Sequence, residues 1–351
     1  MKLLRRYLGS RTFEANGTAT MRLPRNHCYS ALQFVLIAQI DRDDQGNAGT
    51  CRDSAPAQLV KRLDLTLNGK NTIKKLDFET LHRMNQIRHG TRPYIYAHNL
   101  LGYGALTNDV SKVYAQLDFE LPRNGPWLKN PDTLLDARGL SALDLEITWG
   151  AIADIVDDAH NAGLTLDEAK LHVFTVERVG APVREYALWK EYRLISRTLA
   201  GAGVATIDLP VNTTFADILI KTHSDGDQVD TIIPFGLANT NEIQLYSGTD
   251  VFLRQPAGLL QAANRIEAQI EVPERVGSGA ALNHAQQELL MEGYYHINFC
   301  HDGRLTEMLD ATRLSDLKVD LDCAVPGTQD VVDVYCSEII VPPAGSAVQA
   351  A

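Results

Sequence analysis

The sequence contains no apolar stretch long enough to form a transmembrane helix. Its basic start, MKLLRRYLGS, is not followed by the apolar run of a signal peptide, so we expect the chain to be made and folded in a cytosol. The five cysteines show no CxxC spacing and are odd in number. This pattern argues against a metal or redox site and favours reduced, packed thiols.

The common catalytic and cofactor motifs are also missing. The chain has no GxSxG, no P-loop and no GxGxxG, and its ten histidines include no HxH pair of the kind that binds a metal in cupins. His296 and His301 are the only close pair on an expected strand, and their odd spacing places them on opposite faces. The segment 277–279, Gly-Ser-Gly, could bind an anion through free amides, but an ordinary loop explains it equally well. We therefore expect no enzymatic activity and no bound cofactor.

Positive charge is scarce, because the net charge is −11 and the calculated pI is near 5.4. This balance argues against direct binding of nucleic acid. The one basic cluster comprises Lys2, Arg5 and Arg6 at the amino end. It is either a solvated terminus or a contact with an anionic surface such as a membrane or with a neighbouring subunit.

What the sequence does contain is an internal repeat. SRTFEANGTATMRLPRN (10–26) is similar to SRTLAGAGVATIDLPVN (196–212), and YAQLDF (114–119) is similar to YYHINF (294–299). A third block, LDARGLSALDLEI at 135–147, is similar to LDATRLSDLKVDL at 309–321. Three blocks in the same order indicate two copies of one fold with diverged loops. On this basis Leu23 should be equivalent to Leu209, Phe119 to Phe299 and Leu143 to Leu317.

The repeat also suggests domain boundaries. We expect a first jelly roll over residues 1–155, a connector over 156–190, a second jelly roll over 191–341 and a mobile tail over 342–351. Long loops are expected at 41–58, at 122–133 and at 150–190.

Most segments alternate between apolar and polar residues with a period of two, which is typical of strands with one buried face. The run ALQFVLIAQI (31–40) is apolar almost throughout, so we expect it to be covered on both faces. Asn68-Gly69 predicts a tight hairpin turn.

Short helices are expected between strands. They should start after Asp77, after Pro256 and near Ala280, with Asn85 and Asn264 at equivalent positions in the first two. About eight strands per copy, with helices only in the loops, predict an all-β fold of two tandem eight-stranded jelly rolls.

Two acidic clusters follow equivalent strands of the two copies, one made of Asp41, Asp43 and Asp44 and the other of Asp225, Asp227 and Asp230. Carboxylates on loops are the ligands that calcium prefers, although neither cluster has EF-hand spacing. Calcium binding and a purely solubilising role therefore both remain open.

The opening SRT…G-x-A-T…LP-x-N, the strand running into Asn68-Gly69 with its following helix, and DTLLDARGLSALDLEI (132–147) resemble a known family. They are similar to the double jelly-roll major capsid proteins of tailless, membrane-containing icosahedral phages, particularly the corticovirus-like group. The resemblance implies a structural major capsid protein that forms pseudo-hexagonal homotrimeric capsomers around an internal lipid membrane.

The same resemblance implies the surroundings of the protein. Its partners would be neighbouring capsomers, penton or spike proteins and minor membrane proteins, in a virion capsid whose subunits are synthesised in the host cytoplasm. The long loops would form an exterior tower or an intersubunit clasp, and Lys2, Arg5 and Arg6 would lie toward the base.

Two other interpretations compete with the capsid one. A two-domain carbohydrate-binding or carbohydrate-active β-sandwich should show exposed aromatic platforms and often secretion, whereas aromatic residues make up only 7% of this chain. A bicupin-like enzyme lacks its metal ligands.

Overall fold

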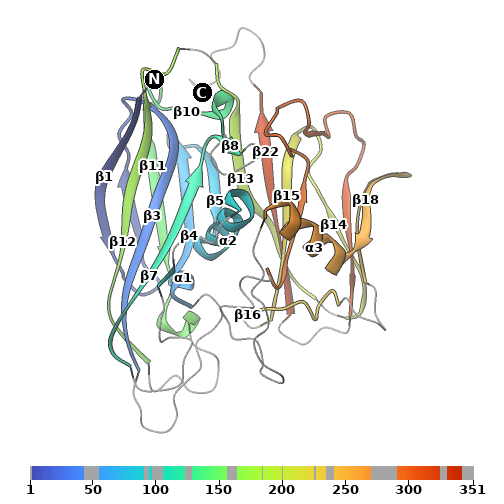
Figure 1. Ribbon diagram of the computed structural model, residues 1–351, viewed down its shortest axis with the longest axis horizontal. Helices are drawn as coiled ribbons and strands as arrows, with labels where there is room; N and C mark the ends of the chain where they lie inside the picture. Colours follow the sequence, from blue (N-terminus) through green and yellow to red (C-terminus); the bar gives the residue numbers. More distant parts are fainter. Residues whose placement is uncertain are drawn as a thin grey trace. The chain divides into compact units, whose positions relative to one another are not determined.

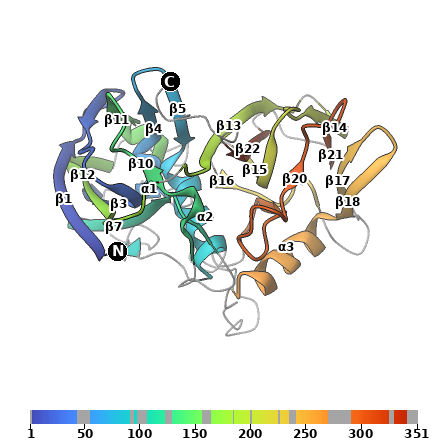
Figure 2. The ribbon, with the colours of Figure 1, turned by 90° about the horizontal axis from the view of Figure 1, so that it is seen from above.

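The computed structural model describes residues 2–42, 55–90, 95–96, 106–122, 129–155, 164–183, 185–199, 201–224, 227–234, 241–269, 291–324 and 330–341. The chain forms two compact units, one built mainly from residues 1–189 and the other mainly from residues 190–340. Each unit consists of two antiparallel sheets that face one another (Figures 1 and 2). No helix in the described ranges is long and apolar enough to cross a bilayer.

The first unit places a long sheet against a shorter one. The long sheet has the order β1-β12-β3-β7-β6, with β10 paired to β3, and the shorter one has the order β5-β4-β11-β2. The strands are β1 (Lys2–Thr12), β2 (Thr18–Arg22), β3 (Cys28–Arg42), β4 (Val60–Leu67), β5 (Asn71–Leu76), β6 (Ile95–Tyr96), β7 (Leu106–Asp118), β10 (Leu135–Asp136), β11 (Leu143–Trp149) and β12 (Leu164–Val179). The minor elements are α1 (Ala55–Gln58), α2 (Phe78–His89), the β8 (Leu121–Pro122) and β9 (Lys129–Asn130) pair, and the 3-10 helices η1 (Pro131–Thr133) and η2 (Ile152–Ile155).

The second unit repeats this plan. One of its sheets contains β13-β22-β15-β16 in that order, with β19 and β20 also paired to β15, and the other has the order β14-β21-β17-β18. The elements are β13 (Leu188–Thr198), β14 (Gly203–Asp208), β15 (Thr214–Ser224), β16 (Asp227–Gln228), β17 (Glu242–Ser247), β18 (Asp250–Pro256), α3 (Ala257–Glu267), β19 (Tyr294–Asn298), β20 (Leu309–Asp310), β21 (Lys318–Cys323) and β22 (Asp330–Ile340). The core between these sheets is apolar and includes Phe215, Ile243 and Val319, all fully buried.

Backbone hydrogen bonds show that the repeat is preserved in strand register. The Leu23 amide donates to the Leu143 carbonyl over 2.8 Å, and the Leu209 amide donates to the Leu317 carbonyl over 2.8 Å. The predicted equivalence of these leucines is therefore confirmed, and the sequence similarity reflects two jelly rolls with the same pairing.

Two further pairs of residues behave in the same way. Phe119 donates its amide to the Ser30 carbonyl, and Phe299 donates its amide to the Ala216 carbonyl. The shared arginine of the SRT motif also keeps its contact, because Arg11 and Arg197 donate to the carbonyls of Thr20 and Thr206. These contacts confirm the predicted equivalence of Phe119 and Phe299.

The segment 156–190 is not the connector that the sequence suggested. It contains β12, a 16-residue strand that pairs with β1 on one side and β3 on the other. The strand was missed because a register shift between Leu166 and Glu168 interrupts its alternation, which becomes regular only from Leu171. The expected long loop at 150–190 is wrong for the same reason.

Other loop expectations are met in part. The 122–133 segment contains β9 and η1, and the 41–58 segment ends in α1. The tail 342–351, the expected helix from Ala280 up to residue 290 and Trp127 lie outside the described residues.

The predicted Asn68-Gly69 turn joins β4 and β5, with both residues in the left-handed region at φ 52° and 69°. An L-residue with a Cβ is strained there, so we expect Gly69→Ala to lower the free energy of unfolding by about 1 kcal/mol. Gly139→Ala is the matched control, because its added Cβ would also meet no atom within 4 Å but its φ is not positive. Urea denaturation measures both; an equal effect of the two substitutions would contradict the strain argument.

Candidate functional site

Helix α2 closes the edge of β7 with side chains that replace a neighbouring strand. Asn85 donates from Nδ2 to the Gln116 carbonyl over 2.7 Å and accepts the Gln116 amide at Oδ1 over 2.6 Å. One turn earlier, His82 Nδ1 lies 2.6 Å from the Tyr114 carbonyl. Asn85 is fully buried. The helix thus occupies backbone groups that would otherwise be open to another strand.

Helix α3 does the same for β19 in the second unit. Asn264 donates to the His296 carbonyl over 2.8 Å and accepts the His296 amide over 2.9 Å. The predicted equivalence of Asn85 and Asn264 is therefore confirmed, and it extends to both hydrogen bonds. We call this two-bond contact the asparagine clamp.

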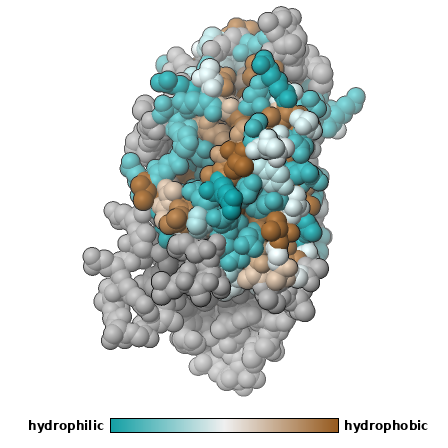
Figure 3. Space-filling view, turned by 90° about the vertical axis from the view of Figure 1, so that its right-hand side faces the viewer, coloured by the Kyte–Doolittle hydropathy of each residue, from teal (hydrophilic) through white to brown (hydrophobic). Residues whose placement is uncertain are grey.

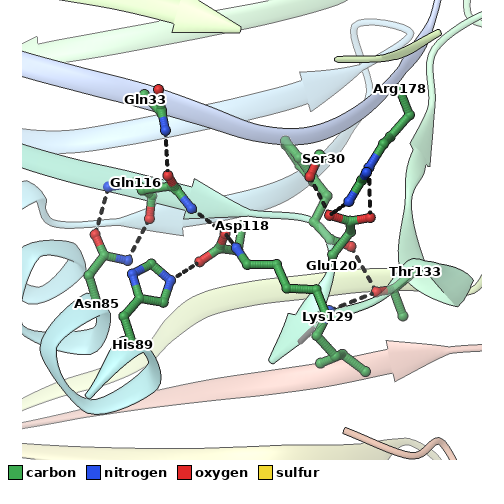
Figure 4. A network of polar contacts seen from close by, with 12 residues as sticks. Ser30, Gln33, Asn85, His89, Gln116, Asp118, Glu120, Lys129, Thr133 and Arg178 are labelled. Atoms are coloured by element: carbon green, nitrogen blue, oxygen red, sulfur yellow. Dashed lines mark hydrogen bonds and ion pairs between the residues drawn. The ribbon is translucent and has the colours of Figure 1, made fainter. Parts of the chain in front are cut away.

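A buried polar network continues from the clamp of the first unit (Figure 4). Gln116 accepts from Gln33 over 2.7 Å and donates to Asp118 over 2.6 Å. Asp118 also contacts His89 Nε2 at 2.8 Å, from the last turn of α2, and Lys129 Nζ at 2.5 Å, from β9. These contacts join β3, β7, α2 and β9 through a single buried carboxylate.

A second buried carboxylate lies two residues further along the chain. Glu120 binds Arg178 of β12 through two hydrogen bonds, of 3.1 and 3.0 Å, and accepts the Ser30 hydroxyl. Nearby, Thr133 donates to the Phe119 carbonyl over 2.7 Å and accepts the Leu121 amide. The base of the 122–133 segment is thereby fixed to the long sheet at both of its ends.

The charge of Asp118 is maintained despite its complete burial. Burial by itself raises the pKa of a carboxyl group, but the Lys129 charge and the hydrogen bond and charge of His89 outweigh it and hold the pKa of Asp118 well below 3.8. The network therefore contains an ionised buried carboxylate that contacts the Lys129 ammonium group and the His89 ring. These contacts fix β9, which carries Lys129, to the end of β7, which carries Asp118.

The two acidic clusters can be followed only in part. Asp41 and Asp227 have described backbones in β3 and β16, but their side chains, together with Asp43, Asp44 and Asp225, lie outside the description. Asp230 is fully described: its Oδ1 accepts from Gln261, from the Gly293 amide and from the Tyr295 hydroxyl. Asp230 therefore ties α3 to the start of β19.

Metal and thiol chemistry finds no support in the described ranges. They contain no group of three His, Cys, Asp or Glu side chains that could hold an ion. His296 is buried, whereas His301 is exposed and lies 2.6 Å from Glu267. The described cysteines are four buried free thiols, namely Cys28, Cys300, Cys323 and Cys336. Calcium binding by the acidic clusters stays a prediction.

The basic cluster lies on β1, the edge strand of the long sheet. Lys2 and Arg5 are exposed, and Arg6 lies 3.4 Å from the buried Glu177 of β12. The sequence predicted this basic cluster but not the carboxylates of the network. A signal was present, since Gln116, Asp118 and Glu120 recur at every second residue and so form a polar run along one face.

Comparison with known proteins relates the fold to one group. No family model and no curated protein matches this sequence. Among solved structures, a chain in the atomic structure of Sulfolobus turreted icosahedral virus matches with a TM-score of 0.70 and 16% identity, covering 100% of this chain and 96% of that chain. The major capsid protein of bacteriophage PM2 matches with a TM-score of 0.56 and 15% identity, covering 98% and 100%.

A third match comes from another virus. The Faustovirus major capsid protein has a TM-score of 0.54 and 8% identity, covering 97% of this chain and 90% of that chain. The three matches span nearly the full length of the chains on both sides, so they include both jelly rolls and their order. The predicted resemblance is confirmed at the level of architecture: this chain has the double jelly-roll fold of viral major capsid proteins.

Proposed function

We propose that this chain is the structural major capsid protein of an icosahedral virion, without enzymatic activity of its own. The observation that carries the proposal is the duplication within one subunit. Two jelly rolls share their strand register, as the Leu23–Leu143 and Leu209–Leu317 contacts illustrate, and full-length structural matches are major capsid proteins.

The duplication suits a hexagonal tile. Three copies of the chain supply six similar jelly rolls, so a three-fold assembly can occupy a six-fold position in a shell. A soluble carbohydrate-binding module has no comparable need for two diverged copies of one sandwich. We therefore propose a homotrimeric, pseudo-hexagonal capsomer that contacts neighbouring capsomers.

Further partners follow from the same proposal. An internal lipid membrane, minor membrane proteins and penton or spike proteins would contact such a shell, in a virion assembled after synthesis in the host cytoplasm. The exposed Lys2 on β1 provides one cationic group for these contacts.

The mass of the purified protein in solution tests this proposal. With a chain of 38.7 kDa, light scattering after size-exclusion chromatography should give about 116 kDa. An interface of the obligate kind buries upwards of about 2,000 Å², so the trimer should persist at submicromolar concentration. A monomer at all concentrations and salt levels would remove the capsomer proposal and favour the carbohydrate-binding alternative.

A further inference from the structure

The long sheet of the first unit has an apolar and aromatic outer face. Strand pairing places Tyr7, Phe174 and Val35 on this face together with Ile37 and Tyr114. The Tyr7 ring packs 5.0 Å from that of Phe174 and its hydroxyl lies 2.9 Å from His172 Nδ1, yet 53% of the Tyr7 surface stays exposed. Burial of β3 on both sides was expected, but the outward side chains Val35 and Ile37 are only half-buried in the single chain.

Cations surround these apolar residues. The register places Arg5, Lys112, Lys170 and Arg178 on the same outer face. The acids described on this face already have partners: Glu168 contacts Lys170, Glu120 binds Arg178, and Asp118 is buried beside Lys129. Asp167, at the end of the same face, accepts a hydrogen bond from Gln39. We call this surface the basic face; among its described residues, Arg5 and Lys112 are the cations that form no ion pair with another described side chain.

The shorter sheet of the second unit, β14-β21-β17-β18, has an outer face of the opposite sign. Outward-facing acids dominate it, namely Asp208, Asp320, Asp322 and Glu242. Its two cations are occupied, because Lys318 lies 4.0 Å from Asp208 and Arg254 lies 2.8 Å from Glu242. We call this surface the acidic face.

Apolar side chains are interspersed among these acids. Val204, which is 62% exposed, lies at one end of the sheet opposite Asp322. Val251, which is 52% exposed, lies at the other end beside Tyr246 of β17. Figure 3 shows this side of the molecule, where separate hydrophobic residues emerge from a hydrophilic surface. Such a mixture of exposed apolar and charged side chains is compatible with a protein–protein contact.

We propose that the basic face of one copy of the chain packs against the acidic face of a second copy. The proposal rests on the proposed capsomer and names the surfaces that build it. The contact is heterologous, since each copy contributes a different face at each of its two junctions, and such contacts close into rings when the rotation allows. Two basic faces, or two acidic faces, would repel each other.

The asparagine clamps restrict the other ways in which copies could join. Asn85 and Asn264 occupy backbone groups at the edges of β7 and β19, so strand addition is blocked at these positions. Contact through the faces of the sheets buries the half-exposed Val35 and Ile37 and pairs Arg5 and Lys112 with acids, which strand addition does not do.

Charge reversal tests the assignment of the faces. The variant Arg5→Glu/Lys112→Glu should raise the dissociation constant of the trimer by about 10- to 1,000-fold, and Asp208→Lys/Asp322→Lys should do the same. A chain that carries all four substitutions presents swapped but complementary faces and should regain the trimer. Sedimentation equilibrium at several salt concentrations measures each constant.

Matched controls place the same charge changes elsewhere. Arg22→Glu lies on the outer face of the other sheet of the first unit, and Glu185→Lys lies in an exposed loop. Both should leave the trimer intact. Urea denaturation shows whether each variant is still folded. If the four-substitution chain regains the trimer, the double variants had lost the contact and not the fold.

The outcomes distinguish this proposal from the function on which it depends. If the unmodified chain is a monomer, the capsomer proposal fails, and the proposed contact between the basic and acidic faces fails with it. If the unmodified chain is a trimer and both double variants stay trimeric at the same concentrations, the capsomer stands and the assignment of the faces is wrong. Weakened double variants that the combined chain does not rescue also overturn the pairing of these two faces.

Discussion

Replacing Asn85 with leucine should lower the free energy of unfolding by about 2–5 kcal/mol. Leucine has the same number and branching of side-chain heavy atoms as asparagine, so the substitution removes the two hydrogen bonds without opening a cavity. It leaves the Gln116 amide and carbonyl without their side-chain partner in a fully buried place, and each unsatisfied buried group costs about 1–3 kcal/mol.

The equivalent substitution in the second unit provides an internal comparison. Asn264→Leu should also lower the free energy of unfolding, but by less than Asn85→Leu, because Asn264 is 7% exposed and Asn85 is fully buried. Asn26→Leu, in an exposed bend, is the control and should change stability by less than about 0.5 kcal/mol. Urea denaturation that finds Asn85→Leu no worse than Asn26→Leu would contradict the clamp.

Replacing Asp118 with asparagine should lower the free energy of unfolding by about 3 kcal/mol. The amide keeps the shape of the carboxylate but leaves Lys129 and His89 facing a neutral group, and breaking a buried ion pair from one side costs about 3–5 kcal/mol. We expect the lower end because the Lys129 and His89 side chains each keep 18% of their surface exposed. The double variant Asp118→Asn/Lys129→Met also removes the Lys129 charge and should recover part of the lost free energy of unfolding.

The same carboxylate predicts a pH dependence. Because the folded-state pKa of Asp118 lies below its ordinary value of 3.8, its stabilisation is fully present above that value and is lost as the pH falls below it. The acid side of the stability curve should therefore be shallower in Asp118→Asn than in the unmodified chain. Asp144→Asn is the control, since its partner Arg22 is largely exposed and such pairs contribute about 0–1 kcal/mol. If stability fell equally steeply at acid pH in all three proteins, Asp118 would not be the source of the pH dependence.

The repeat made most of the fold predictable. The repeated leucines Leu23 and Leu209 predicted the strand register, because a jelly roll needs inward side chains at the same strand positions in each copy. Asn68-Gly69 and the helix after Asp77 were predictable from local backbone preferences, and the structure has the turn and the helix there, with Asp77 as N-cap residue but without a side-chain capping hydrogen bond.

The rest depended on contacts between residues distant in sequence. The strand β12 joins residues 164–179 to both β1 and β3, and its polar start concealed a pairing that only the assembled sheet makes favourable. The ion pairs of Asp118 and Glu120 involve Lys129 of β9 and Arg178 of β12. No spacing rule relates these residues, so sequence patterns showed polar side chains without their partners.

The outline of the purified assembly in electron microscopy tests the central claim most directly. If two jelly rolls per chain form a tile, class averages viewed along the symmetry axis should show a three-fold particle with six similar lobes, and reconstruction should place the basic face of each copy against the acidic face of the next. Particles with three lobes, or a single-copy particle at every concentration, would contradict the account.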